Sequence, residues 1–484
     1  MAVPPAVRLG RTKAFNLSGK APPGRLHLST STSATPLKFN PADPNHQFWS
    51  NICQPSLKAL FKYSKAYTAE DEESHLAWFR DTAVPHLGPR PSPTSPLSSM
   101  LNWDGSPYRP QWNFCGDSST VRIGFDPTVP RTNTSPFEPD YLGGPAGVMS
   151  YFAASSNNSE TDMSWANQLV SSLSPTAQEA QSLTKVWDHA KVLPPQNFLA
   201  WGCKTGGKRE FKPYFFPWHK TLATGETDDE IVYFAAHDVA SLPGSEDLQP
   251  VLKMLRQYTS SRADILTPNM IGIDCVAADK ARLKIYALVQ TNAFNFMKDA
   301  MTLGGRVSTG EAERGVECLK GIYHLMMGER TADRIDHGIS KQPVHEAIWP
   351  RMSIVSWEMK VGRDVPEVKL YLPLWHFANT EGEVVENVKE MFRRFGWNEQ
   401  ARIYGEALKE AFPHVDFNKR AGTHGWMSFS YSDKKGPYAT MYLVPRAQEA
   451  YGLQEGIINE TGKKQEFAWH PASEGHWTYR DFAG

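Results

Sequence analysis

Three stretches of the sequence share one pattern: residues 211–217 read FKPYFFP, residues 282–288 read RLKIYAL, and residues 366–373 read PEVKLYLP. Each contains a lysine followed two positions later by a tyrosine, as in Lys212 and Tyr214. Because side chains at i and i+2 of a β-strand point to the same face, each stretch is expected to place an ammonium group beside a phenol. If the three strands share one sheet or barrel, they form a wall of cations and aromatic rings.

A wall of this kind suits a ligand that has a phosphate end and forms an organic cation. Cationic side chains and phenolic hydroxyls bind a multiply charged phosphate, and tyrosine faces stabilise an organic cation. Both are needed when an allylic prenyl group leaves its diphosphate as a carbocation. Arg122 is expected to extend the wall on an earlier strand, and Tyr438 and Tyr442 add two phenols on one strand face.

The alternative is an ordinary exposed strand face, because lysine is mostly exposed and tyrosine is common in strands. That alternative suits a single Lys-x-Tyr unit. It suits three units less well, since each occupies the second strand of a successive predicted hairpin. The repetition therefore favours a buried cationic wall.

Helical and hairpin patterns alternate along the chain. Apolar residues at helical spacing predict helices over residues 48–61, 70–84, 160–192, 246–261, 311–330 and 383–411. Strand and turn patterns predict strands at 100–103, 111–114 and 120–125, and hairpins at 196–217, 270–290, 352–374 and 424–444. Hairpins repeated in this way can close into one barrel with helices outside it. Residues 1–40, rich in Pro, Ser, Thr and Gly, are expected to form a flexible N-terminal segment, and residues 41–484 a single domain.

Composition argues against several classes of protein. Lys and Arg number 51 against 52 Asp and Glu, which is unlike a general nucleic-acid binder. The five cysteines form no CxxC pair, so neither a disulfide framework nor a structural zinc site is expected, and a reducing cytoplasm is the simplest location. No apolar run approaches the roughly 18 residues of a membrane-spanning helix. The acidic run at 228–230 is read as the start of a helix, so no metal ion is expected.

The segments around these residues are where the chain resembles a known family, the fungal aromatic prenyltransferases of the dimethylallyltryptophan synthase type. The resemblance runs from about Phe48 to Pro445. Its strongest parts are LGPRP at 87–91, DGSP at 104–107, VRIGFDP at 121–127, KPYFFP at 212–217, RLKIY at 282–286, PEVKLYLP at 366–373 and FSYSDKKGPY at 429–438. It implies an α+β fold with a single closed antiparallel β-barrel of about ten strands ringed by α-helices, the ABBA or PT barrel.

The resemblance also implies an activity. It is the metal-independent transfer of a dimethylallyl or longer prenyl group from its diphosphate to an electron-rich aromatic acceptor in fungal secondary metabolism, with no cofactor. The residues that it implies for diphosphate binding are Arg122, Lys212, Arg282, Lys284, Lys369 and Tyr438. The catalytic tyrosines that it implies as a shield for the allylic cation are Tyr214, Tyr286, Tyr371 and Tyr442. Phe216 stands where relatives often have a further tyrosine of this shield.

Three positions differ from the relatives that act on tryptophan. Arg109 replaces a glutamate that accepts the indole N–H, Phe198 replaces a lysine that takes the ring proton, and Asn269 replaces an arginine that holds the amino-acid carboxylate. With Leu101, these are the expected acceptor-binding residues. The acceptor is therefore expected to be a phenolic, polyketide or larger indole compound rather than free L-tryptophan.

Two alternatives stay open from the sequence. One is a protein that binds an isoprenoid diphosphate without turnover, and the other is an enzyme on the same scaffold that cyclises an already prenylated aromatic. The expected partners are a prenyl diphosphate donor, with dimethylallyl diphosphate favoured, and an aromatic small molecule. Neither nucleic acid nor a membrane is an expected partner, and a homodimer is allowed.

Overall fold

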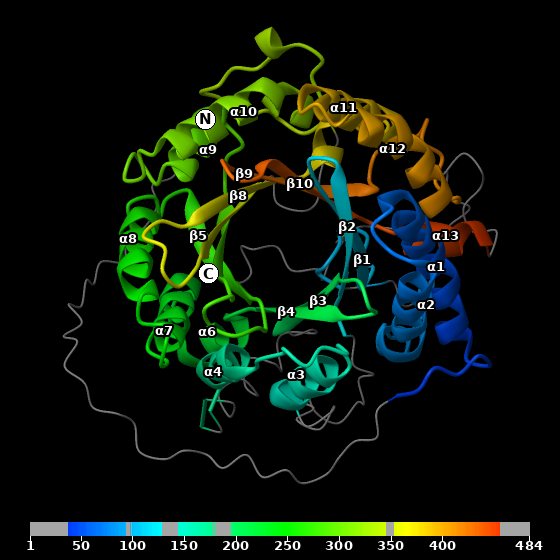
Figure 1. Cartoon of the computed structure of the whole chain (residues 1–484), viewed down its shortest axis with the longest axis horizontal. Helices are drawn as coiled ribbons and strands as arrows, with labels where there is room; N and C mark the ends of the chain where they lie inside the picture. Colours follow the sequence, from blue (N-terminus) through cyan, green and yellow to red (C-terminus); the bar gives the residue numbers. More distant parts are fainter. Residues whose placement is uncertain are drawn as a thin grey trace, which may run out of the picture.

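The computed structural model describes residues 37–92, 97, 99–127, 144–176, 178–179, 195–344 and 353–454. Residues 1–36, most of the expected flexible segment, lie outside the described residues. Figure 1 looks into a ring of strands that is surrounded by a ring of helices. This is the architecture that the alternation of helical and hairpin sequence predicts.

Ten antiparallel strands form one closed barrel. They are β1 (Tyr108–Cys115), β2 (Ser118–Phe125), β3 (Asn197–Cys203), β4 (Arg209–Phe215), β5 (Leu266–Ile273), β6 (Leu283–Val289), β7 (Ser353–Met359), β8 (Glu367–Leu372), β9 (His424–Ser432) and β10 (Gly436–Leu443). Each strand pairs with its neighbours in sequence, and the pairing of Gln111 in β1 with Tyr442 in β10 closes the ring. The predicted fold class is therefore confirmed.

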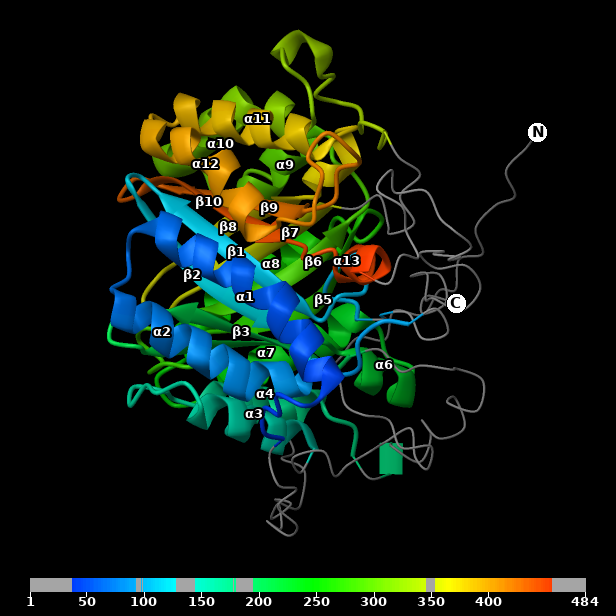
Figure 2. The same cartoon turned by 90° about the vertical axis from the view of Figure 1, so that its right-hand side faces the viewer.

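The helices cover the outside of the barrel (Figures 1 and 2). In the described part of the chain they are α1 (Pro44–Ser64), α2 (Ala69–Trp78), α3 (Gly144–Ala154), α4 (Ser164–Leu173), α6 (Trp218–Thr224), α7 (Asp228–Ala240), α8 (Leu248–Ser260), α9 (Phe294–Met301), α10 (Gly310–Met326), α11 (Glu381–Arg394), α12 (Asn398–Ala411) and α13 (Ala447–Gln454). Figure 2 shows α6 and α13 at the same end of the barrel.

The apolar core lies between the barrel and the helices. Trp112 of β1 stacks on Tyr404 of α12 with ring centroids 5.7 Å apart. The ring centroids of Trp201 in β3 and Trp78 in α2 are 4.9 Å apart. Truncating a core tryptophan to alanine typically costs about 3–5 kcal/mol. Because outward positions alternate with inward ones along each strand, this packing leaves every second residue facing the barrel interior.

Two predicted elements are wrong. Residues 100–103 form a turn and not a strand, because the chain reverses at Gly105, whose φ is 76° and whose amide donates to the carbonyl of Asn102. The predicted helix at 383–411 is two helices, α11 and α12, since Gly396 with φ of 80° ends the first. Positive φ is a conformation that glycine adopts without steric cost.

Other helix boundaries also differ from the prediction. The helix predicted at 70–84 is α-helical only to Trp78. It continues as a wider π-helical turn, Phe79–Ala83, and ends in a 3-10 turn, Val84–His86, which contains Pro85, a residue with no amide to donate. Of the helix predicted at 160–192, α4 covers ten residues, and residues 180–194 lie outside the described part. The acidic run at 228–230 does begin α7, with a capping box between Thr227 and Glu230, as predicted.

Candidate active site

The inner face of the barrel carries the charged side chains. Lys212, Lys284 and Lys369 are between 3% and 6% exposed, whereas lysines on a solvated strand face are mostly exposed. Their neighbours along the strands, such as Phe211 and Ile285, point outward into the apolar core. The exposed-face alternative is therefore wrong.

Asp274, which directly follows β5, holds three of the predicted cations. Its Oδ1 accepts hydrogen bonds from Lys212 Nζ at 2.8 Å and Lys284 Nζ at 2.6 Å. Its Oδ2 accepts from Arg282 Nε at 2.6 Å. One buried carboxylate thus joins side chains from β4 and from the start of β6.

Glu358 of β7 continues the network. Its Oε2 accepts from Arg282 Nη1 at 2.7 Å, and its Oε1 accepts from Lys369 Nζ at 2.9 Å. On the other side, Glu210 pairs with Lys212 and, at 2.9 Å, with Lys204. The result is a continuous layer of ion pairs, which we call the cation layer: Glu210, Lys212, Asp274, Arg282, Lys284, Glu358 and Lys369.

Sequence reasoning found the four cations of this layer and missed its three carboxylates. The signal was present for Glu210, which lies two residues before Lys212 and therefore on the same strand face. Asp274 and Glu358 are harder to find, because their partners are brought to them by strand pairing. The pairing of Lys284 with Glu358 between β6 and β7 is one example.

Arg122 lies on the same inner face beside this layer. Its Nη1 donates to Gln111 Oε1 at 3.4 Å, and its buried Nε has no hydrogen-bond partner among the described residues. It is close enough to Arg282 and Tyr438 to interact with both electrostatically. A guanidinium with an unused donor here is suited to binding an anion.

Burial and ion pairing shift the protonation of the cation layer in different directions. Burial lowers the pKa of Lys284 to about 7, an effect that Asp274 offsets only in part. Burial would also lower the pKa of Lys369, but the charge of Glu358 and smaller contributions from its other neighbours together outweigh burial, so the pKa is raised. The pKa values of Asp274 and Glu358 are lowered, because the neighbouring cations outweigh the effect of burial.

The pKa of Lys284 predicts a pH dependence of donor binding. Its charged form decreases above about pH 7 in the free enzyme, while a diphosphate ligand favours that form. We therefore expect kcat/KM for the prenyl donor to fall as pH rises from about 7 to 9, by up to about tenfold per pH unit. The measurement is a pH profile at subsaturating donor. In Lys284→Arg, which stays charged, the fall should be absent, and a flat wild-type profile would contradict the assignment.

The predicted tyrosines form a second layer, which we call the tyrosine layer. Ring centroids of Tyr214 and Tyr286 are 5.8 Å apart, those of Tyr286 and Tyr371 5.9 Å, and those of Tyr371 and Tyr442 5.7 Å. Three of the tyrosines lie two residues beyond a lysine on β4, β6 and β8, and these alternate strands run in the same direction. The tyrosine layer therefore lies on one side of the cation layer. Tyr438 lies nearer the lysines, with Lys369 Nζ 5.3 Å from its ring centroid.

Gly272 of β5 keeps room for two of these rings. A Cβ at this position would lie 3.0 Å from the Tyr214 ring and 3.1 Å from the Tyr286 ring. Both distances are tighter than ordinary contacts. The glycine therefore lets the two rings approach the strand and each other.

Beyond the tyrosines lies an apolar cluster of Leu101, Phe198 and Phe216. Phe198 and Phe216 meet edge to face at 4.9 Å, and Phe216 stacks on Trp218 of α6 at 4.2 Å. Since α6 lies at the end of the barrel that Figure 2 shows beside α13, this cluster belongs to that end. We call it the apolar layer.

Arg109 joins the apolar layer to the tyrosine layer. Its Nη1 donates to the Leu101 carbonyl at 2.8 Å, and its guanidinium carbon is 5.3 Å from the Tyr442 ring centroid. Its buried Nε has no hydrogen-bond partner among the described residues. The structure thus brings together three of the four predicted acceptor residues: Arg109, Phe198 and Leu101.

Asn269 is placed differently. It is the extra residue of a bulge in β5, where Pro268 pairs with Ala287 and Met270 pairs with Tyr286. It is buried, but the described contacts do not join it to Arg109, Leu101 or Phe198. Its role in acceptor binding stays a prediction.

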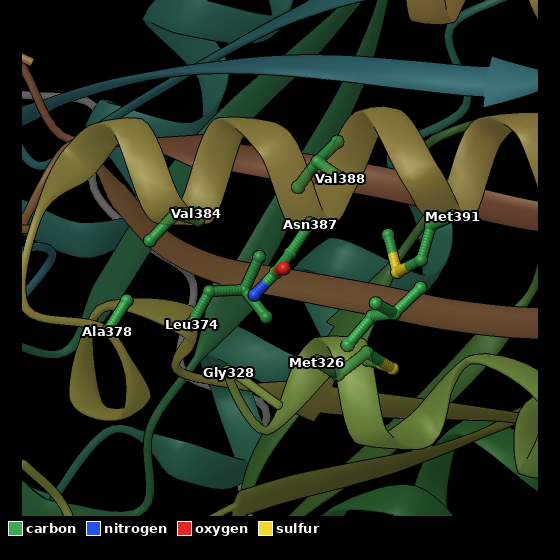
Figure 3. A pocket seen from close by; sticks show the side chains of 9 residues that line it. Met326, Gly328, Leu374, Ala378, Val384, Asn387, Val388 and Met391 are labelled. Atoms are coloured by element: carbon green, nitrogen blue, oxygen red, sulfur yellow. The ribbon is translucent and has the colours of Figure 1, made fainter. Parts of the chain in front are cut away.

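An apolar crevice lies outside the barrel, between α10 and α11 (Figure 3). Its lining is apolar apart from Asn387 and includes Met326, Val388 and Met391. No ionisable side chain lines it, so it lacks the chemistry of the barrel interior.

Among the described residues, no three His, Cys, Asp or Glu side chains are arranged to hold a metal ion. No described helix combines the length and apolarity needed to cross a membrane.

The closed barrel defines a structural class, because solved structures with the same fold are prenyltransferases. AnaPT from Neosartorya fischeri superposes with a TM-score of 0.69 at 20% identity, over 83% of this chain and 94% of that one. NotF in complex with brevianamide F and DMSPP gives a TM-score of 0.69 at 20% identity, over 84% and 95%. The fold is therefore the PT barrel.

The sequence comparisons give the family. The model of the family described as tryptophan dimethylallyltransferase matches residues 45–407. The indole diterpene prenyltransferase terF of Tolypocladium album is 30% identical over 82% of this chain and 93% of its own length. The O-glucose prenyltransferase PaPT of Phomopsis amygdali is 27% identical, over 88% and 96%. The chain belongs to the tryptophan dimethylallyltransferase family and is an aromatic prenyltransferase.

Proposed function

We propose that this enzyme transfers a dimethylallyl group from its diphosphate to an indole-bearing or phenolic polycyclic acceptor larger than free L-tryptophan. The observation that carries the proposal is the order of the three layers inside the barrel. The cations lie on one side of the tyrosines, and an apolar aromatic layer with one guanidinium lies on the other. A prenyl diphosphate and an aromatic acceptor would meet in that order.

The cations act on the leaving group. As the allylic C–O bond breaks, negative charge gathers on the diphosphate oxygens, and donors fixed around that point stabilise the charge where it develops. Arg282, Lys284 and Lys369 are already held in place by Asp274 and Glu358, so little reorganisation is needed. This supports ionisation without a metal ion.

The tyrosines act on the prenyl cation. Their ring faces stabilise positive charge, and their packing keeps out water that would convert the cation to an alcohol. The acceptor ring then attacks the cation, forming the new carbon bond and losing a proton to a base or to the released diphosphate. A scaffold that only bound the donor would not need the third, apolar layer.

Metal independence predicts a simple result. Because side-chain cations supply the positive charge, turnover with dimethylallyl diphosphate should continue in excess EDTA with little change in rate. The measurement is product formation by chromatography with and without EDTA. Loss of turnover in EDTA, restored by Mg²⁺, would mean that the side chains alone do not stabilise the leaving group.

The proposal for the acceptor rests on the apolar layer. A bound amino acid would need a partner for its ammonium group, and the inward carboxylates found here, Asp274, Glu210 and Glu358, all belong to the cation layer on the other side of the tyrosines. An indole N–H against Arg109 would also stay unpaired, at a cost of roughly 1–3 kcal/mol. Relatives named as indole diterpene prenyltransferases support a large acceptor held by apolar contacts.

We therefore expect L-tryptophan to be a poor acceptor, with a kcat/KM about 10- to 100-fold lower than that of a polycyclic indole. The experiment compares L-tryptophan, a tryptophan-containing cyclic dipeptide, an indole diterpene and a hydroxylated naphthalene with one donor. Arg109→Glu should raise the rate with L-tryptophan. If L-tryptophan has the highest kcat/KM and Arg109→Glu leaves it unchanged, Arg109 is not in the acceptor site. Product formed without a prenyl donor would instead support the cyclisation alternative.

The remaining predictions concern the whole chain. We propose that residues 41–484 form one domain and that the enzyme acts in the cytoplasm. Phe48 in α1 and Tyr451 in α13 lie near the two ends of the described chain and pack edge to face, with ring centroids 5.9 Å apart, which supports one folded unit.

A further inference from the structure

The cation layer carries its own counter-charges. From Lys212 to Lys369 the ion pairs form an unbroken chain in which Asp274 binds Lys212, Lys284 and Arg282, and Glu358 binds Arg282 and Lys369. Without a ligand, each of the four cations therefore already has a carboxylate partner. A diphosphate that binds here must share them.

Asp274 and Glu358 are the most buried members of the cation layer. The side chains of Asp274 and Glu358 are 2% and 3% exposed, whereas that of Arg282, which bridges them, is 32% exposed. Arg282 is thus the most exposed cation of the layer. We therefore expect the two carboxylates to act on a bound diphosphate mainly through the cations that they hold and by charge repulsion.

Two roles for the carboxylates predict opposite effects on the strength of diphosphate binding. If the carboxylates only hold the cations in place, neutralising one should weaken diphosphate binding. If their charge offsets the pull of the cations, neutralising one should strengthen it, because buried cations that lack a partner gain more from an incoming anion. Three cations share one carboxylate, Asp274, and two of them, Lys212 and Arg282, keep Glu210 and Glu358 as partners when Asp274 is neutralised, which favours the second role.

We propose that Asp274 and Glu358 are positioning residues that promote pyrophosphate release: they attenuate the pull of the cation layer and recapture Arg282, Lys284 and Lys369 when the product leaves. This rests on the proposed function. No bond is made or broken in this step, because only the partners of the cations change. A site that stabilised the leaving diphosphate without such offsetting charges would retain it and slow the next turnover.

The test is pyrophosphate binding to the full-length enzyme, measured by calorimetry for the wild type, Glu358→Gln and Asp274→Asn. Both substitutions keep the side-chain size and remove the charge. We expect the Kd for pyrophosphate to fall about tenfold or more in each variant. With donor and acceptor, the first turnover should stay fast while later turnovers slow, giving a burst. Asp299→Asn is the matched control, since Asp299 pairs with Arg262 at 2.9 Å on α9 outside the barrel.

The outcomes separate the inference from the function that it rests on. Unchanged or weaker pyrophosphate binding in both variants, with normal binding in the wild type, would overturn the inference alone and leave a purely scaffolding role. Failure of the wild type to bind pyrophosphate would count against the donor site itself. If a variant is too unstable for calorimetry, its melting temperature should rise more than that of the wild type as pyrophosphate is added. An equal or smaller rise would overturn the inference.

Discussion

Replacing Lys284 with alanine is expected to lower kcat/KM for the prenyl donor by roughly 30- to 1000-fold, a loss of about 2–4 kcal/mol of transition-state stabilisation. The ammonium group lies 2.6 Å from Asp274 in the buried cation layer. There it strengthens its interaction as charge moves onto the departing diphosphate, in surroundings that screen charge weakly. The measurement is steady-state turnover with varied dimethylallyl diphosphate.

Lys280→Ala is the matched control for this substitution. Lys280 lies in the turn just before β6, and its side chain is 63% exposed beside Glu160. We expect turnover of this variant to match that of the wild type. Wild-type turnover in Lys284→Ala as well would show that the cation layer is not the donor site.

The second large effect is expected at the tyrosine layer. Tyr286 lies between Tyr214 and Tyr371, in ring contact with both. Replacing it with alanine removes a face that stabilises the cation, worth about 0.5–2 kcal/mol, and opens a path for water. We expect slower prenylation and a marked shift of products toward prenyl alcohol, measured as the ratio of alcohol to prenylated acceptor.

Tyr286→Phe is the control that separates the ring from the hydroxyl. It keeps the aromatic face, so the product ratio should stay near that of the wild type. An unchanged ratio in Tyr286→Ala would mean that water is excluded by other groups. The melting temperature of both variants should be recorded, because a lost core ring alone can destabilise the fold.

The barrel and its inward wall could be predicted because they depend on local periodicity. A spacing of two residues fixes Lys284 and Tyr286 on one strand face whatever the rest of the chain does. Turn sequences, which contain a glycine in three of the four hairpins, predict the hairpins in the same way. The strand prediction at 100–103 fails because it rests on residue propensity alone. The chain reverses directly afterwards, at Asp104–Gly105, and propensity does not show that this reversal determines the backbone conformation of the four residues before it.

The charge balance of the site could not be predicted from the same patterns. Asp274 meets Lys212 across 62 residues of sequence, and Glu358 meets Arg282 across 76. Those contacts depend on strand register and on rotamers, which a single sequence does not specify. The predicted acceptor residues divide in the same way: Arg109 and Phe198 lie at regular strand positions, while Asn269 falls on a bulge that breaks the alternation.

The central claim is that the donor binds with its diphosphate on the cation layer and its prenyl group against the tyrosines. The most direct test is a crystal structure with dimethylallyl thiolodiphosphate, which the enzyme should bind without rapid turnover. We predict diphosphate oxygens within hydrogen-bond distance of Arg282, Lys284 and Lys369, and the prenyl chain against Tyr286 and its neighbours. Density for the analogue outside the barrel, or a diphosphate that touches none of the three cations, would contradict the account.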